Sequence, residues 1–176
     1  FALIAGLCVS SYAIREGARI RDDKKALSLF ANQMLEINLI SMCVAYVLLF
    51  VVLGVSITLV PYRSLIVFLS IQMLFTTIGV EWVYAIFEEY QYITIRSIVF
   101  KVISIALLFI MVKNEGDVFR YAAVVMFATT GSNILDAFFA RKYFKFSFVP
   151  LQTLKNHIRP IMILFASNIA VMVYVY

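Results

Sequence analysis

Three ionisable residues stand inside apolar stretches of this sequence. Glu81 and Lys101 lie within the segment GVEWVYAIFEEYQYITIRSIVFKVIS at positions 79–104, and Asp136 lies near the end of a later apolar run. A charged side chain at the centre of a membrane helix costs about 2.5–3.5 kcal/mol on insertion scales, so such residues face protein or water and mark polar pathways. We expect the three to serve a polar pathway, with Glu81 and Asp136 as ion-coupling or ion-pairing groups.

Each of these residues is accompanied by hydroxyl or amide side chains at helical spacing. Three polar stripes result: Thr77 with Glu81; Thr94, Ser97 and Ser104 with Lys101; and Thr129, Ser132 and Asn133 with Asp136. A structural role competes with ligand binding, because serine and threonine in membrane helices commonly bond back to their own helix. For Glu81 two alternatives stay open: an ion pair with Lys101, or a place in the headgroup region with Trp82 and Tyr84 as interfacial aromatics.

The composition indicates which kind of secondary structure positions these residues. The 176 residues are 64% hydrophobic and 14% charged, with a mean hydropathy of +0.97, whereas a soluble domain is about half apolar and a quarter charged. Four runs carry no charge at all: Ile37–Val60, Ser64–Val80, Tyr121–Leu135 and Pro160–Tyr176. Since about 20 apolar residues span a bilayer as a helix, the expected fold class is all-α, a polytopic transmembrane helical bundle.

Six helices are predicted, at about 1–14, 32–60, 64–85, 92–112, 118–140 and 159–176. The chain begins and ends inside apolar runs, so we expect further sequence on both sides. Asp22 or Asp23 is expected to cap the second helix, and Asp117 the helix at 118–140. The connection 141–158 mixes phenylalanines with lysines, which suits a segment lying against anionic lipid, with a buried strand as the alternative.

Lysine and arginine are divided unequally between the two sides of this topology. The connections 15–31, 86–91 and 141–158 fall on one side, and only Arg63, Lys113 and Arg120 of the 15 lysines and arginines lie nearest the other side. The positive-inside rule makes the first side cytoplasmic. Because this topology explains the net charge of +5, no nucleic-acid partner is expected.

Patterns typical of enzymes and metal sites are missing from the sequence. No set of His, Cys and carboxylate residues has metal-ligand spacing, and no Gly-rich phosphate loop or Ser–His pairing is present. Cys8 and Cys43 are expected to pack as small hydrophobic residues. His157, the only histidine, is expected to be solvated in the basic connection. We expect no catalytic residue, no cofactor and no metal.

Two stretches of the chain resemble the polysaccharide repeat-unit (O-antigen type) flippases of the multidrug/oligosaccharidyl-lipid/polysaccharide transporter superfamily. They are IREGARIRDDKKALSLF at 14–30 and GVEWVYAIFEEYQYITIRSIVFKVISIALLFIMVKNEGD at 79–117, where the order EW…EEY…ITIRS…K carries the likeness. The resemblance implies two six-helix lobes around a central cavity and alternating access. Residues 1–158 would then be part of the N-terminal lobe, and residues 159–176 the start of the first helix of the second lobe.

The resemblance also implies an activity and a setting. The family moves undecaprenyl-diphosphate-linked oligosaccharides from the cytoplasmic to the periplasmic leaflet for surface polysaccharide synthesis (O-antigen, capsule or exopolysaccharide). It implies a multi-pass protein of the bacterial inner (cytoplasmic) membrane. The implied partners are the lipid-linked oligosaccharide, membrane lipids and other polysaccharide-assembly proteins such as a polymerase.

The family pattern points to individual residues as well. Arg15, Arg19, Arg96 and Lys101 become candidates for substrate binding, together with Glu81. Arginine suits a diphosphate through bidentate charge-assisted hydrogen bonds, and lysine acts as a compact charge. Two other functions stay open: a cation-coupled multidrug exporter of the same superfamily, which would favour acidic cavity residues, and a membrane-embedded glycosyl- or acyltransferase.

Overall fold

The chain folds into helices joined by short connections. The computed structural model describes residue 6, residues 9–114 and residues 116–175, and no strand occurs among them. The helices are α2 (Val9–Arg19), α3 (Lys24–Val55), the 3-10 helix η1 (Ile57–Tyr62), α4 (Arg63–Ile78), α5 (Glu81–Ile86), α6 (Tyr90–Met111), α7 (Val118–Phe139), the 3-10 helix η2 (Ala140–Lys142) and α8 (Leu151–Val175). The predicted all-helical class is confirmed.

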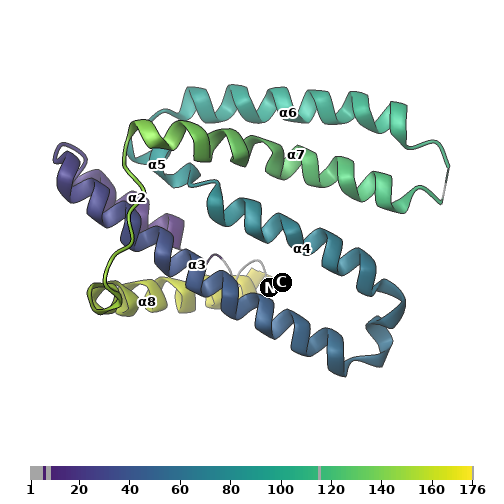
Figure 1. The fold of residues 1–176 in the computed structure, drawn as a ribbon, viewed down its shortest axis with the longest axis horizontal. Coiled ribbons are helices and arrows are strands. Elements are labelled where there is room, and N and C mark those ends of the chain that lie inside the picture. The colour runs from purple at the N-terminus through teal and green to yellow at the C-terminus, as the bar shows by residue number, and fades with distance from the viewer. Residues whose placement is uncertain (1–5, 7–8, 115, 176) are drawn as a thin grey trace.

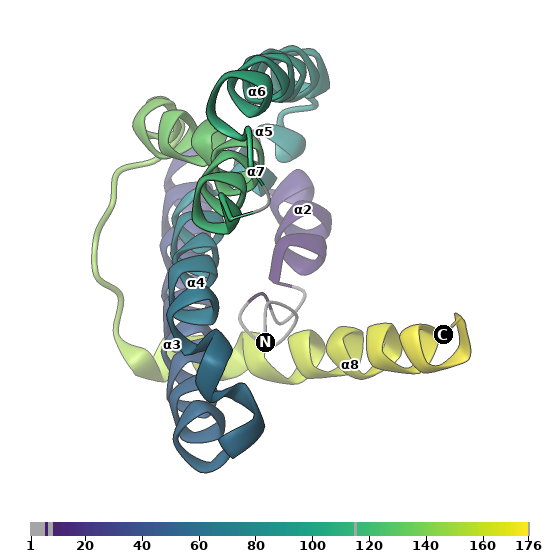
Figure 2. The same cartoon turned by 90° about the vertical axis from the view of Figure 1, so that its right-hand side faces the viewer.

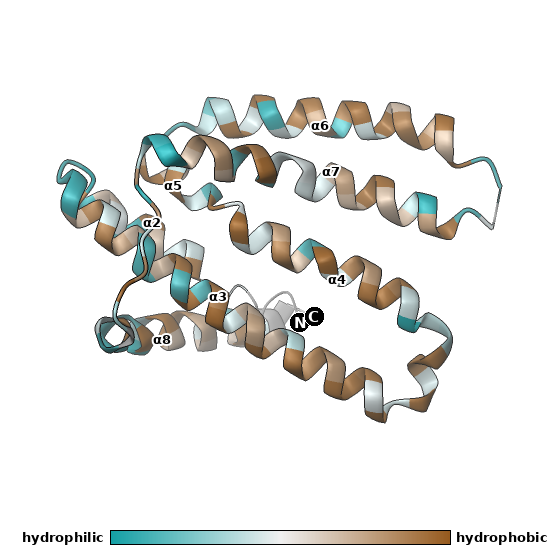
Figure 3. Cartoon of the chain, viewed as in Figure 1, coloured by the Kyte–Doolittle hydropathy of each residue, from teal (hydrophilic) through white to brown (hydrophobic). Residues whose placement is uncertain are grey.

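Four stretches are long and apolar enough to cross a membrane. They are Lys24–Val55, Ile57–Ile86, Tyr90–Met111 and Val118–Lys142. Figure 3 shows apolar residues along these helices and polar residues gathered toward their ends. The chain therefore has the helices of a membrane protein. Half of the predicted first helix at 1–14, including Cys8, lies outside the described residues, and its part from Val9 onward belongs to α2.

The long helices run back and forth between two ends of the molecule (Figure 1). The connections at 20–23, 87–89 and 140–150 lie at one end, on the left of Figure 1, and those at 56–62 and 112–117 lie at the other. Along the bundle, α6 packs against α7, α7 against α4, and α4 against α3. Figure 2 shows α8 leaving this bundle and projecting away from α6 and α7.

The main hydrophobic core gathers α2, α3, α5 and the start of α8 at the end that holds three connections. The predicted helix at 64–85 is interrupted, because α4 ends at Ile78 and Val80 adopts a left-handed φ of 38° before α5 begins. That break turns α5 into the core. Trp82 and Tyr84 are consequently only 4% and 2% exposed, so their interpretation as interfacial aromatics is wrong.

Aspartates occupy the N-cap positions of α3 and α7 as predicted, but only Asp23 caps through its side chain. Asp23 caps α3 as predicted, since its carboxylate accepts hydrogen bonds from the backbone N–H groups of Lys25 and Ala26 at 2.9 and 3.1 Å. Asp117 occupies the predicted N-cap position of α7, but its side chain makes no capping hydrogen bond. Its carboxylate instead accepts from the N–H groups of Lys113 and Asn114, each at 3.2 Å, and these backbone donors lower the pKa of Asp117.

Two further expectations are corrected. The last helix was expected to begin near 159, but α8 begins at Leu151, so residues 151–158 are helical, and the alternative of a buried strand after α7 is also wrong. Cys43 is exposed on α3 instead of packing inside the protein, because the outward face of this long helix is covered by no other described element.

Candidate functional site

Arg96, Glu81 and Asp136 meet where α5, α6 and α7 converge. The Nη2 atom of Arg96 lies 3.2 Å from Oε2 of Glu81, and its Nη1 atom forms an ion pair with Oδ1 of Asp136. Glu81 is the first residue of α5, Arg96 lies in the N-terminal part of α6, and Asp136 lies in the last turn of α7. Three of the predicted site residues thus form one group, called here the Arg96 cluster.

The two carboxylates of the Arg96 cluster differ in how deeply they are buried. The side chains of Arg96 and Asp136 are 5% and 0% exposed, whereas that of Glu81 is 53% exposed. Removing one member of a buried ion pair is strongly destabilising because the remaining charge is uncompensated, but an exposed pair contributes only about 0–1 kcal/mol. Arg96 and Asp136 therefore hold the helices together, and Glu81 is the member that solutes can reach.

Aromatic rings complete the surroundings of Arg96. Its guanidinium carbon lies 5.3 Å from the centroid of the Tyr92 ring, close enough for a cation–π interaction. Tyr92 stacks on Tyr84, with ring centroids 5.1 Å apart. The hydroxyl of Tyr84 donates to the backbone carbonyl of Asp136 at 2.9 Å. These two tyrosines were missed as site residues, although both stand in the segment at 79–104 that the sequence singles out.

Lys101 does not belong to the Arg96 cluster. The predicted Glu81–Lys101 ion pair is not formed, because Glu81 pairs with Arg96 instead. In the described part of the chain Lys101 forms no salt bridge, and its side chain is exposed. It lines a groove of ≈ 380 Å³ between α6 and α7, whose other walls are apolar apart from Ser104.

Hydroxyl groups of the predicted polar stripes form hydrogen bonds within their own helices. The hydroxyls of Ser104, Thr77 and Thr129 donate to carbonyls of their own helices, those of Phe100, Met73 and Val125, at 2.7, 2.9 and 3.1 Å. These bonds are the back-bonding pattern of membrane helices. For these three side chains the structural interpretation is confirmed.

Arg15 and Arg19 lie together on α2, because α2 continues through Arg19. Both contact Glu16: the Arg15 Nε atom lies 3.2 Å from Oε1, and the Arg19 Nη1 atom lies 3.2 Å from Oε2. Their side chains are 62% and 74% exposed. Among the described residues, neither of them pairs with Glu81 or Asp136, the carboxylates of the Arg96 cluster.

His157 is not solvated in a loop, as the sequence suggested, but connects three helices. Its Nδ1 atom lies 3.0 Å from the hydroxyl of Tyr12 on α2, and its Nε2 atom lies 3.1 Å from Oε1 of Gln33 on α3. Phe30 meets the imidazole edge-on at 5.5 Å between centroids. The partners come from distant parts of the chain, so no sequence spacing indicates them. Burial lowers the pKa of His157, and the nearby charge of Glu16 opposes this shift.

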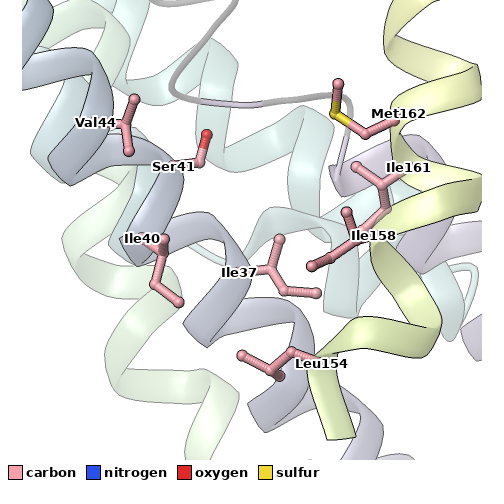
Figure 4. A pocket seen from close by; sticks show the side chains of 8 residues that line it. All are labelled: Ile37, Ile40, Ser41, Val44, Leu154, Ile158, Ile161 and Met162. Carbon is pink, nitrogen blue, oxygen red and sulfur yellow. The ribbon is translucent and has the colours of Figure 1, made fainter. Parts of the chain in front are cut away.

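The cavity between α3 and α8 is almost entirely apolar. Figure 4 shows a cavity of ≈ 250 Å³ between α3 and α8, which is lined by seven apolar side chains and Ser41. Among the described residues, no three His, Cys, Asp or Glu side chains gather to hold a metal ion. The Arg96 cluster is thus the strongest candidate for chemistry within the helices.

Geometry alone defines this candidate site. It consists of a buried arginine shared between one buried and one exposed carboxylate. Comparisons with protein-family models, with curated proteins and with solved structures found no match for this chain.

Proposed function

We propose that this chain is part of the N-terminal lobe of a transporter that flips undecaprenyl-diphosphate-linked oligosaccharides across the bacterial inner membrane for surface polysaccharide synthesis. The observation that carries the proposal is the Arg96 cluster, a buried charge shared by two carboxylates where three helices converge. Ionisable groups at such positions are costly and are characteristic of transport pathways and proton relays. The flippase-like order of residues 79–117 supports the same class of function.

In this proposal the cluster couples a proton to an anionic substrate. Asp136 is fully buried and keeps Arg96 charged and in place, whereas Glu81 is half exposed and accepts the proton. Protonation of Glu81 releases the Nη2 side of the guanidinium. That side can then donate charge-assisted hydrogen bonds to a diphosphate, because two oxygens of one phosphate can accept the two parallel N–H bonds of an arginine.

The remaining predicted residues have supporting places in this scheme. The connections at 20–23, 87–89 and 140–150 share one end of the bundle, and the basic surplus of the sequence makes that end cytoplasmic. Arg15 and Arg19, exposed on α2, attract the anionic substrate near that end. Lys101 supplies a further positive charge along α6.

The test uses the full-length transporter in proteoliposomes and a fluorescent diphosphate-linked oligosaccharide. We expect Glu81→Gln to abolish the pH dependence of flipping, and Asp136→Asn to lower the rate by more than tenfold. Glu88→Gln is the matched control, because its partner among the described residues is Arg21, at an exposed site. If Glu81→Gln and Asp136→Asn both keep the normal rate and pH dependence, the coupling role is wrong.

A cation-coupled exporter is the second candidate, and one observation favours it. When all three members are ionised, the Arg96 cluster carries two negative charges against one positive charge, which suits a cationic solute. Efflux of a cationic dye from the same proteoliposomes discriminates the two functions. Dye transport without flipping of the diphosphate-linked oligosaccharide would decide for the exporter.

A further inference from the structure

A basic pocket lies between the start of α3 and the connection that follows α7. Its volume is ≈ 490 Å³, and five cationic residues line it: Lys24, Lys25, Arg141, Lys142 and Lys145. No carboxylate is among its described lining residues. The pocket lies at the end of the bundle that holds the connections at 20–23, 87–89 and 140–150. It therefore presents a concentrated positive charge at one rim of the helices.

Hydrogen bonds fix the connection that forms one wall of this pocket. Asn32 of α3 is 2% exposed. Its amide nitrogen donates to the carbonyl of Lys145 at 2.9 Å, and its amide oxygen accepts from the N–H of Ser147 at 3.0 Å. One turn further along α3, the carboxylate of Glu36 accepts from the N–H of Val149 at 2.6 Å. The pocket is thus held open before any ligand binds, which reduces the cost of ordering on binding.

Two apolar grooves adjoin the basic pocket. One groove, of ≈ 170 Å³, is lined by Leu35 and Leu39 of α3 with Phe146 and Phe148, and it shares Asn32 and Ser147 with the basic pocket. Glu36 also lines this groove, with its carboxylate engaged by Val149.

The second groove, of ≈ 320 Å³, lies between α4 and α7. Its walls include Phe75 and Phe138, and it shares Arg141 with the basic pocket. Phe146 lines both grooves. A cationic pocket thus adjoins two apolar grooves, which share the Phe146 side chain.

We infer that this arrangement is a binding site for an anionic phospholipid of the adjoining leaflet. The phosphate headgroup lies among the five cations, and the two acyl chains lie in the two grooves beside Phe146. Basic pockets at the cytoplasmic ends of membrane helices suit anionic headgroups for this reason. A free phosphate would leave both grooves unused, and a single polyprenyl chain would leave one. The inference is independent of the proposed transport function.

The experiment uses purified full-length protein in detergent and phospholipids that carry a photoreactive diazirine in their acyl chains. We expect phosphatidylglycerol to label the protein at least tenfold more than phosphatidylcholine with the same chains. Mass spectrometry should place the label on peptides that contain Leu39, Phe146 or Phe138. This comparison uses the unaltered protein, so it does not depend on whether any variant folds.

The charge requirement is tested with matched variants. Lys25→Gln with Lys145→Gln removes two pocket lysines, and at about fivefold per lysine we expect about 25-fold weaker phosphatidylglycerol labelling. Lys113→Gln with Lys155→Gln removes two exposed lysines outside the pocket and should leave labelling unchanged. Folding of both variants is checked by size-exclusion chromatography and circular dichroism.

Four results would overturn the inference. They are equal labelling by the two phospholipids, undiminished labelling of a folded pocket variant, displacement of the lipid by millimolar inorganic diphosphate, and preferential labelling by a photoreactive polyprenyl diphosphate. The third result would make the pocket a site for free phosphate. The fourth would make it a docking site for the transport substrate.

Discussion

Arg96 on α6 and Asp136 on α7 form an ion pair in which neither side chain is more than 5% exposed. Glu81 on α5 contacts the same guanidinium from a half-exposed position. One arginine thus joins three consecutive helices of the chain, and its two carboxylate partners differ in burial. This asymmetry makes the contributions of the two carboxylates separable by experiment.

Asp136→Asn is predicted to lower the free energy of unfolding by about 3–5 kcal/mol, because it leaves the buried Arg96 without its buried counter-charge. Glu81→Gln is predicted to cost no more than about 1 kcal/mol, since Glu81 is 53% exposed and water screens its pair with Arg96. Denaturant titration of the purified protein in detergent measures both. Equal losses for the two variants would show that burial does not govern the cluster.

Gly79→Ala is predicted to destabilise the protein by about 1–3 kcal/mol through overpacking. A Cβ atom at position 79 would lie 2.7 Å from the Cβ of Asn133 on α7, an atom that cannot move without its helix. Gly54→Ala on α3 is the matched control, because nothing lies within 4 Å of its added Cβ and alanine favours the helix. Thermal unfolding in detergent should show opposite shifts, and similar shifts would contradict the close approach of α4 and α7.

Asn32→Ala is predicted to release the connection that lies over α3. Its amide bonds to Lys145 and Ser147 are lost, and each unmade buried hydrogen bond costs about 1–3 kcal/mol. Limited trypsin digestion should cleave after Lys145 about tenfold faster than in the unaltered protein. Asn156→Ala changes an exposed asparagine of α8 and should leave cleavage at Lys145 unchanged.

The docking of α8 is predicted to weaken as the pH falls below about 6.5. Burial lowers the pKa of His157, so the docked state binds fewer protons than the undocked state. The stabilisation is complete above the ordinary pKa of 6.5 and is lost as the pH falls through the lower pKa of the docked imidazole. A cysteine in place of Ile161, which is 1% exposed, reports undocking by its rate of thiol labelling after Cys8 and Cys43 are replaced by serine.

The control for this pH experiment is the same reporter with His157→Gln, which shares the intrinsic pH dependence of the thiol. The labelling rate relative to that control should rise as the pH falls from 7.5 to 5.5. A constant ratio would mean that His157 does not govern the docking of α8.

The sequence by itself determined the properties that belong to single segments. Hydropathy and run length identified the four helices that are long and apolar enough to cross a membrane, because a span is set by the residues within it. The cap of α3 was narrowed to Asp22 or Asp23, because a cap and its partners are near neighbours in the chain, as Asp23 is to Lys25 and Ala26. The basic connections were identified in the same way.

The tertiary structure decided which of these segments face each other. Arg96 and Lys101 are five residues apart on α6, which separates them by about 140° around the helix axis. Arg96 therefore faces the carboxylates while Lys101 faces the groove beside α7. Sequence spacing supplies this angle but not the rotation of the helix, which is set by packing against α7.

Packing between helices also explains why the burial of some residues was predicted wrongly from the sequence. Trp82 and Tyr84 are buried because the chain bends at Val80, and His157 is held by Tyr12 and Gln33 from helices far away in the sequence. Hydropathy acts on each helix separately, whereas such contacts depend on how helices cross. Close approaches such as that of Gly79 to Asn133 fix those crossings, and only the folded chain contains them.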